Sequence, residues 1–218
     1  MLMLIGVCLG LVPMVAAQTL TVHTSQGSGW ILLDLQDLNG QLRQAGYPVI
    51  SESAQLYGGS TFFPQPEANW QWGLTGLFWN AQGGQSVALN ASFLGGLFDW
   101  TVRSLSLGRI SAGLGAGFNM AQLSVRKGVV FSFEDVLHPS QGQFTQIQRW
   151  GVWGTPYLQY ELYVLESDFF VRVWGGMILT PWVSNWSQVA TLFEGVDFAG
   201  PPSNLGGPFG MAELSFGF

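Results

Sequence analysis

Apolar and polar positions alternate along most of the chain, and the last ten residues show this alternation most clearly. Counting back from the C-terminus, Phe218, Phe216 and Leu214 occupy every second position, and Glu213 falls on the other face. A strand places successive side chains on opposite faces. Residues 209–218 therefore predict a strand with one face toward an apolar medium and one toward a mixed interior.

The same alternation recurs in seven earlier segments, so the pattern predicts eight strands. They are residues 29–35, 54–63, 70–80, 86–98, 109–120, 155–165, 169–180 and 209–218. The connections after odd-numbered strands are residues 36–53, 81–84, 126–153 and 181–207, and three of these four are long. The connections after even-numbered strands are residues 64–68, 99–108 and 166–168, and all are compact. Long connections are therefore expected at one end of the sheet, with both termini at the other.

One segment breaks the alternation and has helical spacing instead. Leu35, Leu38 and Leu42 are separated by three and four residues, and the run Ala45-Gly-Tyr-Pro48 is a stop signal. We expect a short amphipathic helix after the first strand, with its apolar stripe against the mouth of the sheet structure.

The hairpin of strands 70–80 and 86–98 has a predicted register. With a turn centred on Gln82-Gly83, Thr75 faces Asn90 and Leu74 faces Ala91. Polar residues then meet polar ones, and apolar residues meet apolar ones, as stable cross-strand pairing requires.

The hairpin of strands 155–165 and 169–180 places two charges together. With a turn at Glu166-Ser167, Glu161 lies directly opposite Arg172. Charges within apolar strands are costly unless they are paired, so we predict an inward-facing ion pair. Two solvated charges on a soluble sheet are the alternative.

The N-terminal region predicts export. The first 17 residues carry no charged side chain and end in Val15-Ala-Ala17, which is typical of a signal peptide with a cleavage site before Gln18. An N-terminal membrane anchor is the alternative, but the run is shorter than the ~20 apolar residues that a spanning helix needs. The expected organisation is a cleaved signal over 1–17, a periplasmic tail over 18–28 and a barrel over 29–218.

Composition narrows the class of protein. Charged residues make up 9% of the chain and hydrophobic residues 48%, whereas average soluble domains are about 25% charged. After the signal no stretch is uniformly apolar over the ~18 residues that mark a spanning helix. High apolar content without such a helix indicates membrane-spanning strands. The net charge of −6 disfavours nucleic acid as a partner.

These features together resemble the small outer-membrane β-barrel proteins of bacteria, over residues 28–218. The resemblance rests on the signal, the alternation, the unequal loops and the terminal Phe218. It implies an all-β fold: a single up-and-down antiparallel transmembrane β-barrel of about eight strands, with one short amphipathic helix after the first strand. It also implies location in the cell outer membrane, contact with outer-membrane lipid, and recognition of Phe218 and Phe216 by the barrel-insertion machinery. A soluble, secreted β-sandwich is the alternative fold, because alternation alone does not separate the two.

Aromatic residues near the strand ends fit such a barrel, since aromatic girdles mark both membrane interfaces. The inner girdle is expected to contain Trp70, Trp72, Phe216 and Phe218. The outer girdle is expected to contain Trp79, Trp150, Trp153 and Trp182.

An eight-stranded barrel has an interior just wide enough for its own side chains. We expect a polar network there that plugs the lumen, which argues against a general porin. Its predicted members are Asp34, Gln71, Asn90, Asn119, Glu161, Arg172 and Glu213. The partner of Glu213 stays open between Arg103 and Arg109.

No catalytic, metal or cofactor site is expected. His138 and Ser140 are superficially similar to the His-x-Ser pair of outer-membrane lipid A deacylases, but they fall in a loop with a proline between them. The aromatic loops 126–153 and 181–207 could cap the mouth, lie among lipid headgroups or bind a partner. The expected role is structural or binding, without catalysis. A lipid-modifying hydrolase and a passage for small apolar molecules are the alternatives.

Overall fold

The computed structural model describes residues 22–65, 68–126, 144–164, 169–188, 197–198 and 205–217. Its elements in chain order are β1 (His23–Leu32), α1 (Gln36–Gln44), β2 (Ser53–Pro64), β3 (Trp70–Gly83), β4 (Val87–Leu105), β5 (Gly108–Arg126), β6 (Phe144–Tyr163), β7 (Phe169–Val183), β8 (Trp186–Gln188), β9 (Asp197–Phe198) and β10 (Gly207–Gly217).

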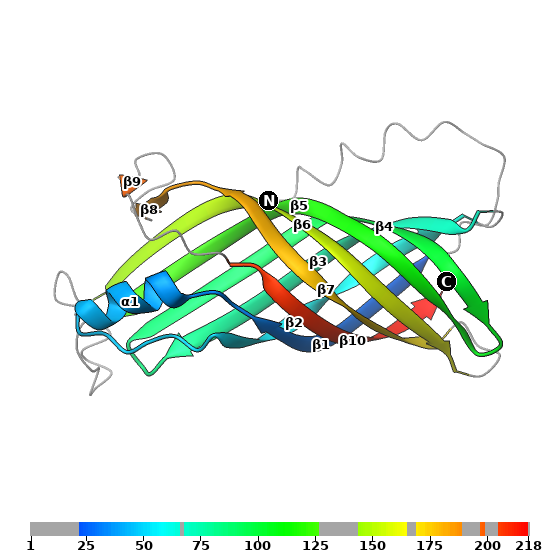
Figure 1. Ribbon diagram of the computed structural model, residues 1–218, viewed down its shortest axis with the longest axis horizontal. Helices are drawn as coiled ribbons and strands as arrows, with labels where there is room; N and C mark the ends of the chain where they lie inside the picture. Colours follow the sequence, from blue (N-terminus) through cyan, green and yellow to red (C-terminus); the bar gives the residue numbers. More distant parts are fainter. Residues whose placement is uncertain are drawn as a thin grey trace.

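Eight of these strands close into one antiparallel barrel (Figure 1). Strands β1 to β7 pair in sequence order, and β10 closes the sheet between β7 and β1. The short strands β8 and β9 extend the sheet beside β6 at one end. Closure confirms the predicted up-and-down barrel, and in it the C-terminal strand pairs with the first. The sandwich alternative is wrong, because one continuous sheet leaves no second sheet to pack against.

The two ends of the barrel differ in their connections (Figure 1). At the end where β1 begins and β10 finishes, here called the terminal end, β4 and β5 are separated by only two residues. The opposite end carries α1 and is here called the helix end. The connections there are residues 33–52, 84–86, 127–143 and 184–206. The predicted inequality of the two sets of connections is confirmed.

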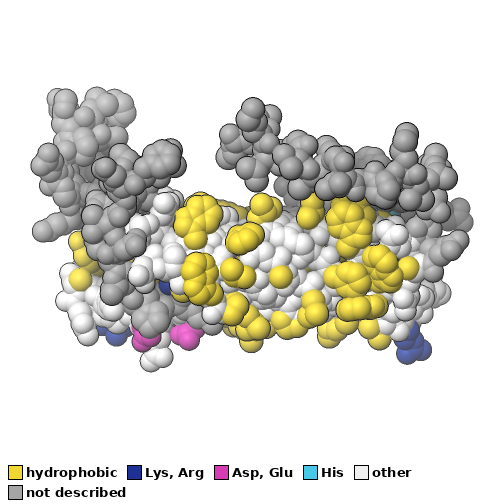
Figure 2. Space-filling model, turned by 90° about the horizontal axis from the view of Figure 1, so that it is seen from above, with side chains coloured by type: hydrophobic (Ala, Val, Ile, Leu, Met, Phe, Trp, Pro, Cys, Tyr) yellow, Lys and Arg dark blue, Asp and Glu magenta, His cyan; other side chains and the backbone are white. Residues whose placement is uncertain are grey.

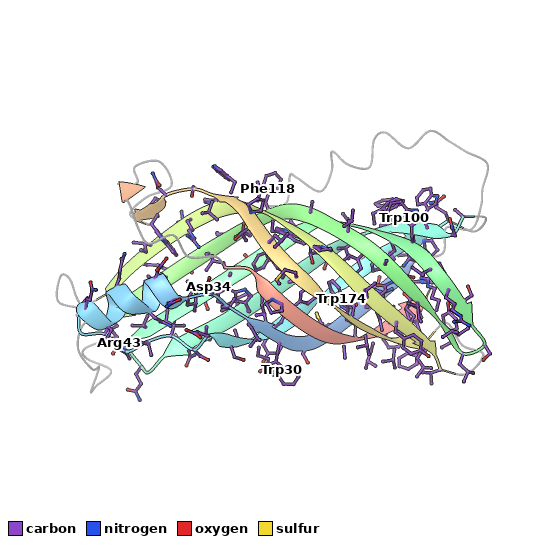
Figure 3. The ribbon with its side chains drawn as sticks, viewed as in Figure 1. Trp30, Asp34, Arg43, Trp100, Phe118 and Trp174 are labelled. Atoms are coloured by element: carbon purple, nitrogen blue, oxygen red, sulfur yellow. The ribbon has the colours of Figure 1, made fainter. Side chains whose placement is uncertain are left out.

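The outer wall of the barrel is apolar. Phe118 is 72% exposed and Trp30 is 66% exposed, and both point away from the barrel in Figure 3, whereas Trp174 lies within it. On the face drawn in Figure 2, hydrophobic side chains are spread along the wall between the two ends, and charged side chains appear only toward the ends. None of the helices in the described part of the chain is long and apolar enough to cross a membrane.

The helix α1 covers the barrel mouth as predicted. Leu38 and Leu42 are buried in the same cluster as the lumen residues, and each such burial is worth about 1.5–3 kcal/mol. Asn39 ties the helix to the chain that follows it. Its amide nitrogen donates to the Ile50 carbonyl at 2.9 Å, and its oxygen accepts from the Ile50 N–H at 2.8 Å.

Several predicted boundaries are wrong because the strands are longer than the alternation indicates. Strand β1 begins at His23, so residues 23–28 belong to the barrel wall and not to a tail. Residues 99–105 complete β4, and residues 144–153 form the first half of β6. The apolar alternation is weak in these stretches, while backbone pairing with a neighbouring strand continues. The predicted signal, residues 1–17, and Phe218 lie outside the described residues.

Candidate functional site: the barrel lumen

Four ionisable residues form a row across four adjacent strands inside the barrel. Arg109, Glu161, Arg172 and Glu213 lie directly opposite one another in turn, on β5, β6, β7 and β10. Their charges alternate along the row, so the two middle residues, Glu161 and Arg172, each face an opposite charge on both sides. This arrangement offsets part of the cost of removing the charges from water.

Arg172 is the centre of the row. Its Nη2 atom lies 2.7 Å from Glu161 Oε1, and its Nη1 atom lies 3.4 Å from Glu213 Oε2. The guanidinium also lies 4.2 Å from the ring centroid of Phe62, a cation–π contact. The predicted inward pair of Glu161 and Arg172 is confirmed. The open question of the Glu213 partner is answered by Arg172, and neither Arg103 nor Arg109 fills that role.

Arg109 extends the row toward a second cluster. Its Nε atom donates to Glu161, and its Nη2 atom donates to Gln71 Oε1 at 2.8 Å. Gln71 in turn donates from Nε2 to Asp99 Oδ2 at 2.8 Å. A single chain of hydrogen bonds therefore runs from β10 through β7, β6 and β5 to β3 and β4.

Asp99 is the acceptor at the centre of this second cluster. It accepts hydrogen bonds from Gln71, from the Tyr157 hydroxyl and from Gln159 Nε2, the last at 2.6 Å. The carboxylate is 1% exposed. Three donors around one buried carboxylate satisfy most of its acceptor capacity, which allows burial without a contacting cation.

Hydroxyl groups from the remaining strands complete the ring. Ser25 donates to Glu213 Oε2 at 2.5 Å, and Ser60 lies 3.5 Å from Glu213 Oε1. Ser60 also donates to Thr75 Oγ1 at 3.2 Å. Each of the eight barrel strands now contributes at least one side chain. We call this set the lumen network: Ser25, Ser60, Gln71, Thr75, Asp99, Arg109, Tyr157, Gln159, Glu161, Arg172 and Glu213.

Glycine on β5 makes room for the network. A Cβ atom at Gly113 would lie 2.6 Å from the Tyr157 hydroxyl oxygen and 2.5 Å from Asp99 Oδ1. A Cβ atom at Gly115 would lie 2.7 Å from Leu97 Cδ2. The small residues of this strand therefore accommodate bulky neighbours inside a narrow barrel.

The lumen changes character toward the helix end. Trp174 packs edge-to-face on Tyr157 and on Phe209, at centroid distances of 5.3 and 5.1 Å, and this aromatic layer covers the network. Beyond it most buried side chains belong to one apolar cluster, which includes Ile31, Leu56, Leu77, Trp79, Leu89, Phe93, Leu123, Trp153 and Ile178. Asn119 and Arg149 are buried polar exceptions in this half. The expectation of a polar interior therefore holds only for the terminal half.

Two predicted members of the network lie elsewhere. Asp34 is exposed beside α1, beyond the end of β1 (Figure 3). Asn90 faces outward and accepts a hydrogen bond from Asn80 on the outer wall. The Asn90 prediction is wrong because the hairpin pairs Asn80 with Asn90 and Thr75 with Gly95. This shift of five residues is odd, so it turns every side chain of β4 to the other face.

The turn explains the shift. Strand β3 continues to Gly83, and Gly84 has φ = +59°, a left-handed conformation that glycine adopts without strain. The turn therefore lies after Gln82-Gly83 and not on it. Trp79, on the same face of β3 as Thr75, and Trp153, on β6, are buried in the lumen, so their assignment to the outer girdle is wrong. Trp150 and Trp182 are 52% and 58% exposed on the outer wall.

Asn119 faces the lumen but is outside the network. It is 2% exposed, and neither atom of its amide has a hydrogen-bond partner among the described residues. It lies opposite Gly151, in the apolar half. Its inward orientation follows from the alternation of side chains along β5. Its distance from the charged row depends instead on how the neighbouring strands are staggered along the barrel axis.

Sequence reasoning missed Asp99, Tyr157 and Arg149. Asp99 stands between two aromatic residues in Phe98-Asp-Trp100, and a lone carboxylate in such a segment is a signal for a buried acceptor. Arg149 is 2% exposed and lies 4.6 Å from the ring centroid of Trp186. Arg149 was assigned to a loop because the predicted strand began only at residue 155, whereas β6 begins at Phe144.

No group of three or more His, Cys, Asp or Glu residues that could hold a metal ion occurs in the part of the chain that the structure describes. His138 and Ser140 lie outside that part. What the lumen network does supply is a set of hydrogen bonds and ion pairs that join the strands.

Comparison with solved structures finds similar chains at low sequence identity. One similar solved structure is Ail, the attachment invasion locus protein of Yersinia pestis, with 11% identity, 92% of this chain and 100% of that chain covered, and a TM-score of 0.47. Another is the outer membrane protein OprG from Pseudomonas aeruginosa, with 12% identity, 90% and 95% covered, and a TM-score of 0.41. No protein-family model matches the chain, and no curated protein matches it.

Proposed function

We propose that this protein is a non-enzymatic barrel of the bacterial outer membrane, with a sealed lumen and a structural or binding role at its outer end. In this proposal the helix end, with its long connections, faces the outside of the cell. The terminal end, where β1 begins and β10 finishes, faces the periplasm. Outer-membrane lipid contacts the wall, and the insertion machinery reads Phe216 and Phe218.

The apolar outer wall supports the membrane location. Side chains such as Leu94, Leu114 and Phe118, in the middle of their strands, are more than half exposed. A soluble protein would not present so continuous an apolar surface to water. The same surface is the expected contact for lipid tails around a transmembrane barrel.

The lumen network is the observation that carries the sealed-lumen proposal. It links all eight strands through hydrogen bonds and ion pairs between buried side chains. An ion crossing the barrel would have to displace these contacts and then enter the apolar half. The arrangement stabilises the barrel and opposes conduction.

Refolding of the full-length protein into planar bilayers tests this directly. We expect the folded protein to be heat-modifiable, which means that its migration on a gel changes on boiling. We also expect it to show no steady single-channel conductance. A matched variant, Arg172→Ala with Glu161→Ala, should raise the frequency of open events, because it removes the centre of the row. Steady conductance of the unaltered protein would refute the sealed lumen, and migration unchanged by boiling would refute the membrane barrel.

A further inference from the structure

A row of uncharged amide side chains crosses the outer wall near the helix end. Gln55, Asn80, Asn90, Gln122 and Gln148 lie directly opposite one another in turn, on the five adjacent strands β2 to β6. We call these five residues the amide row. Neighbouring strands are about 4.8 Å apart, so the row spans roughly 19 Å of the wall. On β8, Ser187 continues it opposite Gln148.

All five side chains face outward. Each lies on the same face of its strand as that strand's exposed apolar residues. Gln55, for example, is on the face of Tyr57, and Gln148 is on the face of Trp150. Within the row, Asn80 donates to Asn90. A carboxamide has two N–H donors and a two-lone-pair acceptor, so this bond uses only part of the capacity of the pair.

The position of the row is set by what lies on either side of it. Two residues nearer the terminal end, the next outward row contains Tyr57, Phe78, Ser92, Met120 and Trp150. Tyrosine and tryptophan mark the level of lipid headgroups. Two residues nearer the helix end, the outward positions on β3, β5 and β6 are Gln82, Ser124 and Gln146. On β2, β3 and β6 the amide-row residue therefore lies one outward position beyond an aromatic residue, and on β1 Trp30 lies directly opposite Gln55. The row runs obliquely across the wall, because the strands of such a barrel tilt by about 35–45°.

The row carries no charge, and this selects its ligand. Lipid phosphates are recognised by Arg and Lys, through charge-assisted hydrogen bonds. The nearest described cation on this face of β5 is Arg126, four residues beyond Gln122. Carboxamides instead present a donor and an acceptor side by side, which match the hydroxyl and N-acyl amide groups of sugars.

We propose that the amide row binds the saccharide headgroups of glycolipids in the leaflet around the helix end. This rests on the proposed membrane function and adds the chemical class of lipid that the wall prefers. Hydrogen bonds to several sugar hydroxyls at once, made at the edge of the apolar wall, give the barrel a preference for glycolipid over phospholipid.

The test uses the full-length protein in nanodiscs that contain phosphatidylcholine with either a neutral diglycosyl diacylglycerol or phosphatidylglycerol. Native mass spectrometry measures the ratio of bound lipid to phosphatidylcholine. We expect the neutral glycolipid to be enriched roughly tenfold, which corresponds to about 1.4 kcal/mol, and phosphatidylglycerol to be close to its bulk ratio.

Asn80→Ala with Gln122→Ala removes one member of each of the four opposed pairs, and it should return the glycolipid to its bulk ratio. Thr24→Ala with Thr61→Ala is the matched control. These two residues also face each other on the wall, at the terminal end, with their Oγ1 atoms 3.5 Å apart. The control should keep the enrichment. Because all four side chains lie on the surface, both variants should retain heat-modifiable migration.

Three results would overturn the proposal: glycolipid enrichment that survives in the amide-row variant, equal enrichment of phosphatidylglycerol, or a dimer that the amide-row variant abolishes. The last would assign the row to contact between two copies of the chain. A protein that enters nanodiscs without selecting glycolipid refutes the amide-row proposal alone. A protein that enters no bilayer refutes the proposed function, and with it the amide-row proposal.

Discussion

At the scale of single residues, the stability of the lumen depends on Arg172. This side chain is 1% exposed and contacts two carboxylates that are equally buried. Each carboxylate has further partners, Arg109 for Glu161 and Ser25 for Glu213. Arg172 is the only described cation within ion-pair distance of both carboxylates, so its loss leaves Glu213 with hydroxyl donors alone.

Arg172→Met should therefore destabilise the barrel strongly. Removing one partner of a buried ion pair costs about 3–5 kcal/mol, because a charge stays buried without compensation. Urea unfolding in lipid vesicles, followed by tryptophan fluorescence, measures the change. Arg43→Met, on the exposed side of α1, is the control and should stay within about 0.5 kcal/mol of the unaltered protein. Equal stability of the two variants would show that the ion pairs add nothing.

At the scale of elements, α1 is fastened to the mouth by a small number of contacts. Leu38 and Leu42 supply the apolar ones, and the Asn39 amide supplies two hydrogen bonds to Ile50. Leu35, at the N-cap position of the helix, makes no capping hydrogen bond with its side chain. A helix of nine residues has little stability of its own, so these tertiary contacts decide whether it forms.

Asn39→Ala should loosen α1 while the barrel stays intact. Both backbone groups of Ile50 lose their partner, at about 1–3 kcal/mol for buried groups left unsatisfied. Hydrogen exchange of residues 36–50 should accelerate, with unchanged exchange in the β-strands. Gln41→Ala, on the exposed side of the helix, is the control. Unchanged protection of residues 36–50 would show that the leucines alone hold the helix.

At the scale of the whole molecule, closure depends on how closely β1 and β10 approach. A Cβ atom at Gly29 would lie 2.6 Å from the Cα atom of Met211, and one at Gly27 would lie 2.7 Å from the Cα atom of Glu213. These contacts are with backbone, which cannot rotate away. At Gly210, on the facing strand, an added Cβ atom would have no heavy atom within 4 Å.

Gly29→Ala should consequently lower the yield of closed barrel, by the 1–3 kcal/mol that overpacking costs. Gly210→Ala is the matched control and should fold normally. The measurement is the fraction of protein that migrates as the heat-modifiable species after refolding into vesicles. A yield for Gly29→Ala equal to that of the control would contradict the close approach at this seam.

The sequence predicted the barrel and part of its interior from local patterns. Glu161 and Arg172 were placed together correctly because only residues 164–168 separate their strands, and a short connection restricts the register of its hairpin. The unequal connections and the short helix were also predicted. Asn90 was misplaced by the position of another turn, at Gly84, because one additional residue in the turn reverses the faces of the strand that follows.

The strand number, the two faces of most strands and the pair of Glu161 with Arg172 are determined by residues near one another along the chain. The tertiary structure alone decides that Arg172 also binds Glu213 and that Asp99 accepts from Tyr157 and Gln159. These contacts join strands that are distant in sequence. Their register follows from the tilt and stagger needed to close eight strands into a barrel, which is a property of the whole sheet and not of any one hairpin.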